Sequence, residues 1–130
     1  MGLTDEERND LIMYRLAKSE EVFQEALDVA SMNHWNLTVN RLYYAVFHLC
    51  SAILLKDGHN ARTHSGIIRM MMMHYVKTSL LTIKDGELIT SLFNMRQSGD
   101  YDDLFDWTRN QIEPMIEPTR ALMTKLRNFL

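Results

Sequence analysis

Residues 40–55, NRLYYAVFHLCSAILL, are the most apolar stretch of the chain and constrain its fold more than any other feature. A helix at a protein surface keeps its apolar side chains on one stripe, whereas here they occur almost all the way round. We therefore expect this helix to be buried on most sides. Its unbroken apolar part is too short for a membrane span, which needs about 20 residues, and Arg41 and His48 interrupt it. The stretch predicts the central helix of a soluble bundle, with no membrane association.

Length and charge limit the classes of protein that fit. A chain of 130 residues suits one domain, residues 1–130, with a proper core. The formal net charge of -3 argues against a general affinity for nucleic acid. Residues 1–30 hold eight acidic and three basic side chains, whereas residues 31–130 hold nine acidic and eleven basic ones. Any contact with a phosphate therefore belongs to the later helices and would be local.

Cysteine usage and the first residues bear on the compartment. Cys50 is the only cysteine, so no disulfide forms within the chain, and it lies in the most apolar stretch. We expect a buried thiol in a reducing compartment. No signal peptide precedes Thr4. These features predict a cytoplasmic protein.

Capping signals mark the first two helices. Thr4 and Glu7 have the spacing of a capping box, which begins a helix that runs to about Ala30. Asn36 is a suitable cap for the second helix. Gly58 stands where that helix would end in the left-handed conformation.

Three further helices follow, over about residues 64–76, 85–98 and 108–129. We expect Gly99 to stop the second of these, and Pro114 and Pro118 to kink the last one or delay its start. No strand pattern or internal repeat occurs. The fold class predicted is all-α: an antiparallel up-and-down helical bundle of four long helices plus a short fifth.

One face of the central helix carries polar groups between small residues: Arg41, Tyr44, Ala45, His48 and Ala52 are spaced three or four apart. The alanines predict a shallow groove that a partner helix or a ligand could enter. In a functional interpretation Arg41 binds a phosphate or carboxylate and His48 transfers a proton. In a structural interpretation Arg41 forms an internal salt bridge and His48 is a hydrogen-bonded core histidine.

Arg96 continues the apolar stripe of Leu88 and Leu92, so its guanidinium should point toward the core or a groove. A buried cation needs an anionic partner, and Asp100 is close enough in sequence to supply it. Complementing the carbonyl end of its own helix is an alternative. We favour a structural Arg96–Asp100 pair over a ligand contact.

The third helix is more apolar than one packing face requires, which predicts a homodimer. Its methionines at 70–73, together with Tyr75, are the expected contact surface, and the alanine-lined face of the central helix is the second choice.

Metal and cofactor sites are not indicated. The histidines are spread over expected helices and loops, without the Glu-x-x-His spacing of metal sites in bundles; they are His34, His48, His59, His64 and His74. Glycine-rich phosphate loops and Cys-x-x-Cys pairs are absent from the sequence. We expect no cofactor.

Three short motifs occur in order: RLYYA at residues 41–45, THSG at residues 63–66 and RQSGDY at residues 96–101. They resemble the R-x-Y-Y-A, T-H-S-G and R-x-x-x-D-Y motifs of small prokaryotic HEPN proteins, over about residues 10–128. The resemblance implies a helical bundle that commonly dimerises. It also implies a nucleotidyltransferase protein as partner, in a toxin–antitoxin or nucleotide-binding pair.

The chain departs from the ribonuclease members of that superfamily, which place a histidine a few residues after the arginine. The corresponding positions here are Tyr101, Asp102 and Asp103. The resemblance thus favours a non-catalytic module that binds a partner, a nucleotide or RNA. The candidate ligand-binding residues are Arg41, Tyr44, His48, His64, Arg96, Asp100 and Tyr101. The alternative is a metal-independent ribonuclease in which His48 or His64 is the acid–base group.

Overall fold

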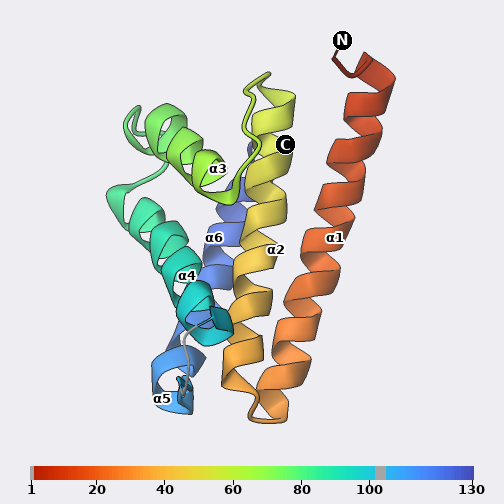
Figure 1. Cartoon of the computed structure of the whole chain (residues 1–130). Helices are drawn as coiled ribbons and strands as arrows, with labels where there is room; N and C mark the ends of the chain where they lie inside the picture. Colours follow the sequence, from red (N-terminus) through yellow and green to blue (C-terminus); the bar gives the residue numbers. More distant parts are fainter. Residues whose placement is uncertain (1, 102–104) are drawn as a thin grey trace.

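The computed structural model describes residues 2–101 and 105–130, and over these residues the chain is all helical, as predicted, without a β-strand. Long helices run up and down the bundle, and α3 lies at the end where both chain termini are found (Figure 1). The helices are α1 (Asp5–Ser31), α2 (Trp35–Lys56), α3 (His64–Met71), α4 (Ile83–Tyr101), α5 (Arg109–Ile112) and α6 (Ile116–Arg127).

The central helix is α2, and its burial confirms the first prediction from the sequence. It contacts α1, α3, α4, α5 and α6. Leu42, Leu49 and Ile53 are fully buried, and Cys50 is a free thiol in the same core. Among the described residues, α2 is also the helix long and apolar enough to cross a membrane, but 67% of that window is buried inside the bundle. Burial of this extent is typical of a core helix.

Several helix ends follow the expected signals. The hydroxyl of Thr4 accepts from the Glu7 amide at 3.1 Å, and the Glu7 carboxylate accepts from the Thr4 amide at 3.0 Å, which completes the capping box. Gly58 has a φ of +79° beyond the end of α2. Around Pro114 the last helix is interrupted by one 3-10 turn, Glu113–Met115, whereas Pro118 lies in the first turn of α6.

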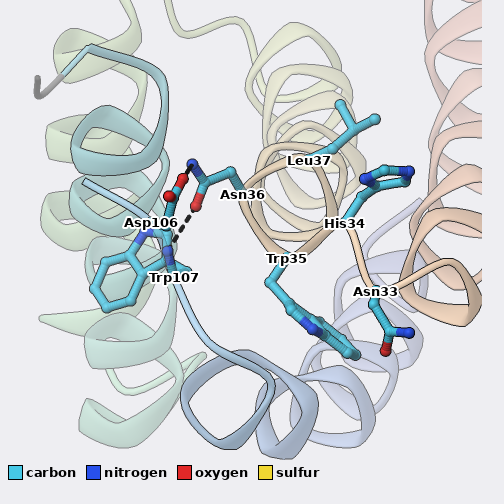
Figure 2. A pocket seen from close by; sticks show the side chains of 7 residues that line it. All are labelled: Asn33, His34, Trp35, Asn36, Leu37, Asp106 and Trp107. Carbon is cyan, nitrogen blue, oxygen red and sulfur yellow. Dashed lines mark hydrogen bonds between the residues drawn. The ribbon is translucent and has the colours of Figure 1, made fainter. Parts of the chain in front are cut away.

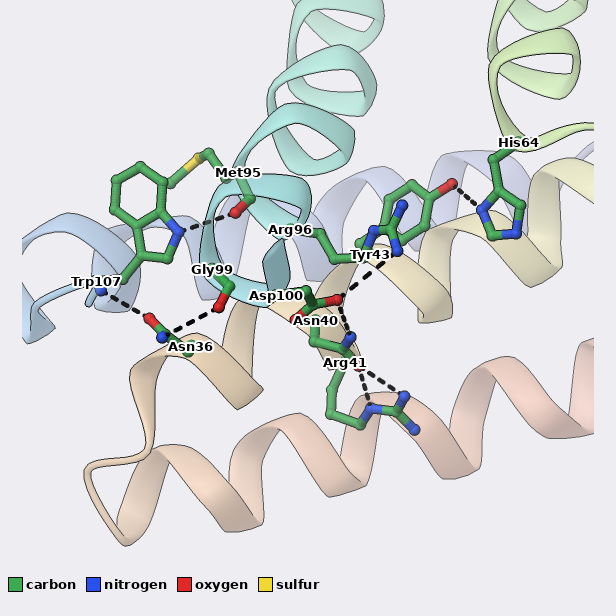
Figure 3. A network of polar contacts seen from close by, with 10 residues as sticks. All are labelled: Asn36, Asn40, Arg41, Tyr43, His64, Met95, Arg96, Gly99, Asp100 and Trp107. Atoms are coloured by element: carbon green, nitrogen blue, oxygen red, sulfur yellow. Dashed lines mark hydrogen bonds and ion pairs between the residues drawn. The ribbon is translucent and has the colours of Figure 1, made fainter. Parts of the chain in front are cut away.

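Asn36 does not cap α2, contrary to the prediction. The helix begins at Trp35, so the cap position is His34, two residues before Asn36, and the His34 side chain makes no capping bond. The Asn36 amide instead donates to the Gly99 carbonyl at 3.3 Å and accepts from the Trp107 amide at 2.7 Å (Figures 2 and 3). The side chain is used to join α2 to the end of α4 and to the segment that follows it.

Gly99 does not stop α4 either, because the helix continues to Tyr101. The glycine serves close packing. A Cβ at this position would lie 3.1 Å from Cδ1 of Trp107 and 3.5 Å from Cγ of Asn36. The indole nitrogen of Trp107 also donates to the Met95 carbonyl at 2.9 Å, which fixes the ring against α4.

Both surfaces chosen for a dimer are largely covered within the chain. Met71 and Tyr75 belong to the core, and Met73 is the exposed member of the methionine run. Residues 72–76 form a π-helical turn after α3. Ala45 and Ala52 are fully buried, on the face whose polar groups meet α1. The groove predicted there is therefore filled by α1 of the same chain.

Candidate functional site

Arg96, near the C-terminal end of α4, is the centre of the candidate site. Only 5% of its surface is exposed. Its guanidinium carbon lies 5.0 Å from the ring centroid of Tyr43, 5.7 Å from that of Tyr44 and 5.8 Å from that of Phe93. Aromatic faces attract a guanidinium, so these rings form a pocket suited to this cation.

Asp100 supplies the predicted anionic partner. Its carboxylate lies 3.7 Å from Nη1 of Arg96. Arg96 precedes Asp100 by one helical turn on α4. The Asn40 amide of α2 donates to the same carboxylate oxygen at 2.8 Å. The Arg96–Asp100 pair is therefore confirmed, and Asn40 connects it to the central helix.

The network continues through Arg41 to α1 (Figure 3). Arg41 donates from Nε and Nη2 to the Asn40 side-chain oxygen at 2.9 and 2.7 Å, and its Nη1 lies 3.1 Å from the Glu25 carboxylate. The Tyr44 ring is between the two cations, 5.5 Å from Arg41 and 5.7 Å from Arg96. Arg41 thus has the internal salt bridge of the structural interpretation.

His64 joins the network from α3. Thr63 caps that helix by accepting from the Gly66 amide at 3.0 Å, which places His64 at its first position. The His64 ring shares a 2.8 Å hydrogen bond with the Tyr43 hydroxyl and stacks on Phe47 at 4.2 Å. Burial, followed by the charges of Arg96 and Arg15, lowers the pKa of His64. The imidazole is therefore neutral at neutral pH.

His48 faces α1, away from this network. Its Nδ1 lies 3.1 Å from Nη1 of Arg15 and accepts from that guanidinium, which leaves the ring proton on Nε2. Burial lowers the pKa of His48 to about 4, with further lowering by Arg15, Lys18 and Arg41. This environment suits a hydrogen-bonded core histidine and opposes protonation.

The structure brings together five of the seven candidates: Arg41, Tyr44, His64, Arg96 and Asp100. His48 lies outside this group. The side chain of Tyr101, and the residues Asp102 and Asp103, lie outside the described part of the chain.

Sequence reasoning missed Asn40, Tyr43 and Asn36, which carry much of the geometry. The sequence did indicate that Tyr43 would be involved in a polar contact, since a tyrosine in a buried helix needs a partner for its hydroxyl. It gave no such indication for the asparagines, because their partners on α4 are about sixty residues away. Asn36 borders a surface hollow of about 420 Å³ that His34, Trp35 and Trp107 also line (Figure 2).

In residues 2–101 and 105–130, no group of three or more His, Cys, Asp or Glu side chains lies close enough to hold a metal ion. The stacked pair His59 and His74, with ring centroids 3.9 Å apart, is the densest imidazole contact there. Two imidazoles alone fall short of the three protein ligands of a catalytic zinc site.

Fold and site together define a class: an all-α module in which a buried arginine–aspartate pair ties the end of one helix to the central helix. The chain belongs to the HEPN domain family, whose sequence profile matches residues 12–129. It is 25% identical over 115 residues to a "Putative toxin" of Methanocaldococcus jannaschii, covering 88% of this chain and 78% of that protein. It is also 25% identical over 124 residues to a UPF0332 protein of Thermotoga maritima, covering 95% and 94%. A second "Putative toxin" of M. jannaschii is 33% identical over 85 residues, 62% of this chain and 63% of that protein.

Proposed function

We propose that this chain is a non-catalytic HEPN binding module of a toxin–antitoxin-like pair, acting in the cytoplasm on a nucleotidyltransferase partner. The observation that carries the non-catalytic part is the state of Arg96. Its guanidinium is buried and paired with Asp100 beneath three aromatic rings. An arginine held in this way stabilises the end of α4 and is not presented to the phosphate of a substrate.

The histidines support the same conclusion. Acid–base cleavage of a phosphodiester works best with a group whose pKa is near the working pH. His48 has a pKa of about 4, so its protonated, acidic form is scarce at neutral pH. The pKa of His64 is also lowered, and Tyr43 holds its Nδ1.

The pairing with a partner protein rests on the family. Two relatives carry the name "Putative toxin", which fits a module that works with an antitoxin. For this chain the partner of nucleotidyltransferase type is our inference from the resemblance of its motifs. A nucleotide or RNA is the alternative ligand of the same module.

The partner is tested by co-purifying the tagged chain with a minimal nucleotidyltransferase from the same genome and measuring affinity by calorimetry. We expect a complex that survives gel filtration at micromolar concentration, and none with an unrelated nucleotidyltransferase domain. Equal binding to both, or to neither, would contradict the proposal. Binding of a nucleotide or single-stranded RNA without the protein partner would support the alternative ligand.

We also propose that the module is a homodimer, although most of the surface first expected, with the exception of Met73, is covered within the chain. Exposed large apolar side chains remain nearby at Met73, Leu80 and Ile83. Light scattering at micromolar concentration should give twice the monomer mass. A monomer mass would refute the dimer.

One observation favours a ribonuclease instead. The Tyr43 ring contacts both groups: its hydroxyl is hydrogen-bonded to His64, and its centroid lies 5.0 Å from the Arg96 guanidinium, whose charge lowers the pKa of His64. If Tyr43 moved, an imidazole and a guanidinium would face one another, as acid–base cleavage requires. An assay of RNA cleavage in EDTA, beside His48→Ala and His64→Ala variants, separates this possibility from the binding module.

A further inference from the structure

A small cavity lies between α1, α2 and the residues that follow α2. Its volume is about 130 Å³, well above the roughly 10–15 Å³ that one water needs. Leucines and Ile67 form much of its lining, and Arg15, Ser51, His59 and Asn60 supply polar groups. We call it the Arg15 cavity.

Arg15 is a half-buried cation without a carboxylate partner among the described residues. Nη1 contacts the neutral His48 ring, and the guanidinium carbon lies 5.9 Å from the Phe47 centroid. Its Nε is buried with no hydrogen-bond partner. Burial lowers the pKa of Arg15, a sign that the charge is poorly compensated.

Ser51 adds a second unmatched group to the same lining. The residue is 6% exposed, and its hydroxyl oxygen is buried without a partner. A serine inside a helix often donates to the carbonyl one turn earlier, and the Ser51 hydroxyl makes no such bond to any described residue. Buried polar groups of this kind are rare and call for an explanation.

We infer that the Arg15 cavity is a binding site for a tetrahedral oxyanion, a phosphate group above all. The guanidinium of Arg15 and the hydroxyl of Ser51 would donate to its oxygens. An anion compensates both the unmatched hydrogen bonds and the charge. A water molecule compensates the hydrogen bonds alone and leaves the half-buried cation without a counter-charge.

The surroundings indicate that the phosphate belongs to an ester. A wider cavity of about 570 Å³ shares Leu55, His59 and Asn60 with the Arg15 cavity. Arg62 is an exposed residue in its lining. A phosphate bound at Arg15 could therefore carry an organic group into the wider cavity, where Arg62 lies.

The experiment titrates the folded chain with inorganic phosphate at constant ionic strength, followed by ³¹P NMR and calorimetry. We expect saturable binding with a Kd on the order of 1 mM. Arg15→Gln should weaken it by about tenfold or more, and Ser51→Ala by several-fold, since hydrogen bonds to charged groups contribute more than neutral ones. Arg69→Gln, which removes an exposed arginine of α3, is the matched control and should bind like the parent.

A second arm uses glycerol phosphate as the ester probe. It should bind more tightly than inorganic phosphate, and Arg62→Gln should remove that advantage without changing the affinity for inorganic phosphate. Equal affinity for both probes in the parent would mean that the site takes the free ion. Ser51→Ala deletes one oxygen that has no partner, so its fold is expected to remain intact, and circular dichroism checks this.

Binding that does not saturate, or that is the same in the parent, Arg15→Gln and Ser51→Ala, would mean an adventitious ion only and would overturn the inference. A crystal structure in phosphate with ordered water at Arg15 Nε and no anion would overturn it as well.

Discussion

The guanidinium of Arg96 lies over the ring of Tyr43, 5.0 Å from its centroid, and the hydroxyl of Tyr43 is hydrogen-bonded to His64. This relationship connects α4, α2 and α3 through one aromatic ring. Burial raises the pKa of Tyr43, so its hydroxyl stays protonated at neutral pH and keeps a proton for that hydrogen bond. Arg96 therefore acts as part of the packing between helices.

The Arg96–Asp100 pair should be measurable as a coupling energy. Arg96→Ala and Asp100→Ala should each lower the free energy of unfolding by about 1–3 kcal/mol, because each removes one member of a buried ion pair. The double variant should lose less than the two single losses together, by about 0.5 kcal/mol or more. Urea unfolding of the parent, the two single variants and the double variant gives this double-mutant cycle.

Arg109 and Glu113 form the matched control, since they have the same spacing in an exposed position. Their coupling should be about 0.3–0.5 kcal/mol. An Arg96–Asp100 coupling no larger than that of the control would show that burial does not strengthen the pair.

Asn36→Ala should lower the free energy of unfolding by about 1–3 kcal/mol, because it removes the acceptor of the Trp107 amide and a donor to the Gly99 carbonyl. Asn110→Ala, at an exposed position, should change it by less than about 0.5 kcal/mol. Thermal unfolding followed by circular dichroism gives both values. A loss for Asn36→Ala no greater than for Asn110→Ala would refute the role of Asn36 as a connector.

Much of the fold was predictable because its signals are local. The capping box of Thr4 and Glu7, the left-handed Gly58 and the break at Pro114 each depend on a few neighbouring residues. The prediction that Gly99 ends α4 was wrong because a glycine is compatible with either a helix end or close packing. Which of the two applies depends on Trp107, which reaches Gly99 only in the folded chain.

The candidate site was predictable in part for the same reason. Arg96 and Asp100 are one turn apart on a helix, so their pairing could be inferred from spacing. The environment of His48 could not, because Arg15 lies thirty-three residues earlier and reaches it only when α1 packs on α2. That contact decides between a core histidine and a proton-transfer group.

His48 should make the protein less stable at mildly acidic pH. Its pKa is about 4 when folded and near 6.5 when unfolded, so the unfolded chain binds the proton first as the pH falls. This contribution is fully present above about pH 6.5 and is lost progressively between about pH 6.5 and 4. Between pH 7 and pH 5, the free energy of unfolding measured in urea should fall less for His48→Gln than for the parent.

An NMR titration checks the cause directly. The His48 ring should titrate with a pKa of about 4, well below the ordinary value for histidine. A pKa near 6.5 for His48 would contradict the proposed burial against Arg15.

Cleavage of RNA by the purified chain is the measurement that tests the central claim most directly. Structured and single-stranded RNA are incubated with the protein in EDTA, beside His48→Ala and His64→Ala variants prepared in the same way. Because Arg96 is paired in the core and both histidines have lowered pKa values, we predict no turnover above that of the variants. Turnover that survives EDTA and is lost in either variant would contradict the binding module and establish a ribonuclease.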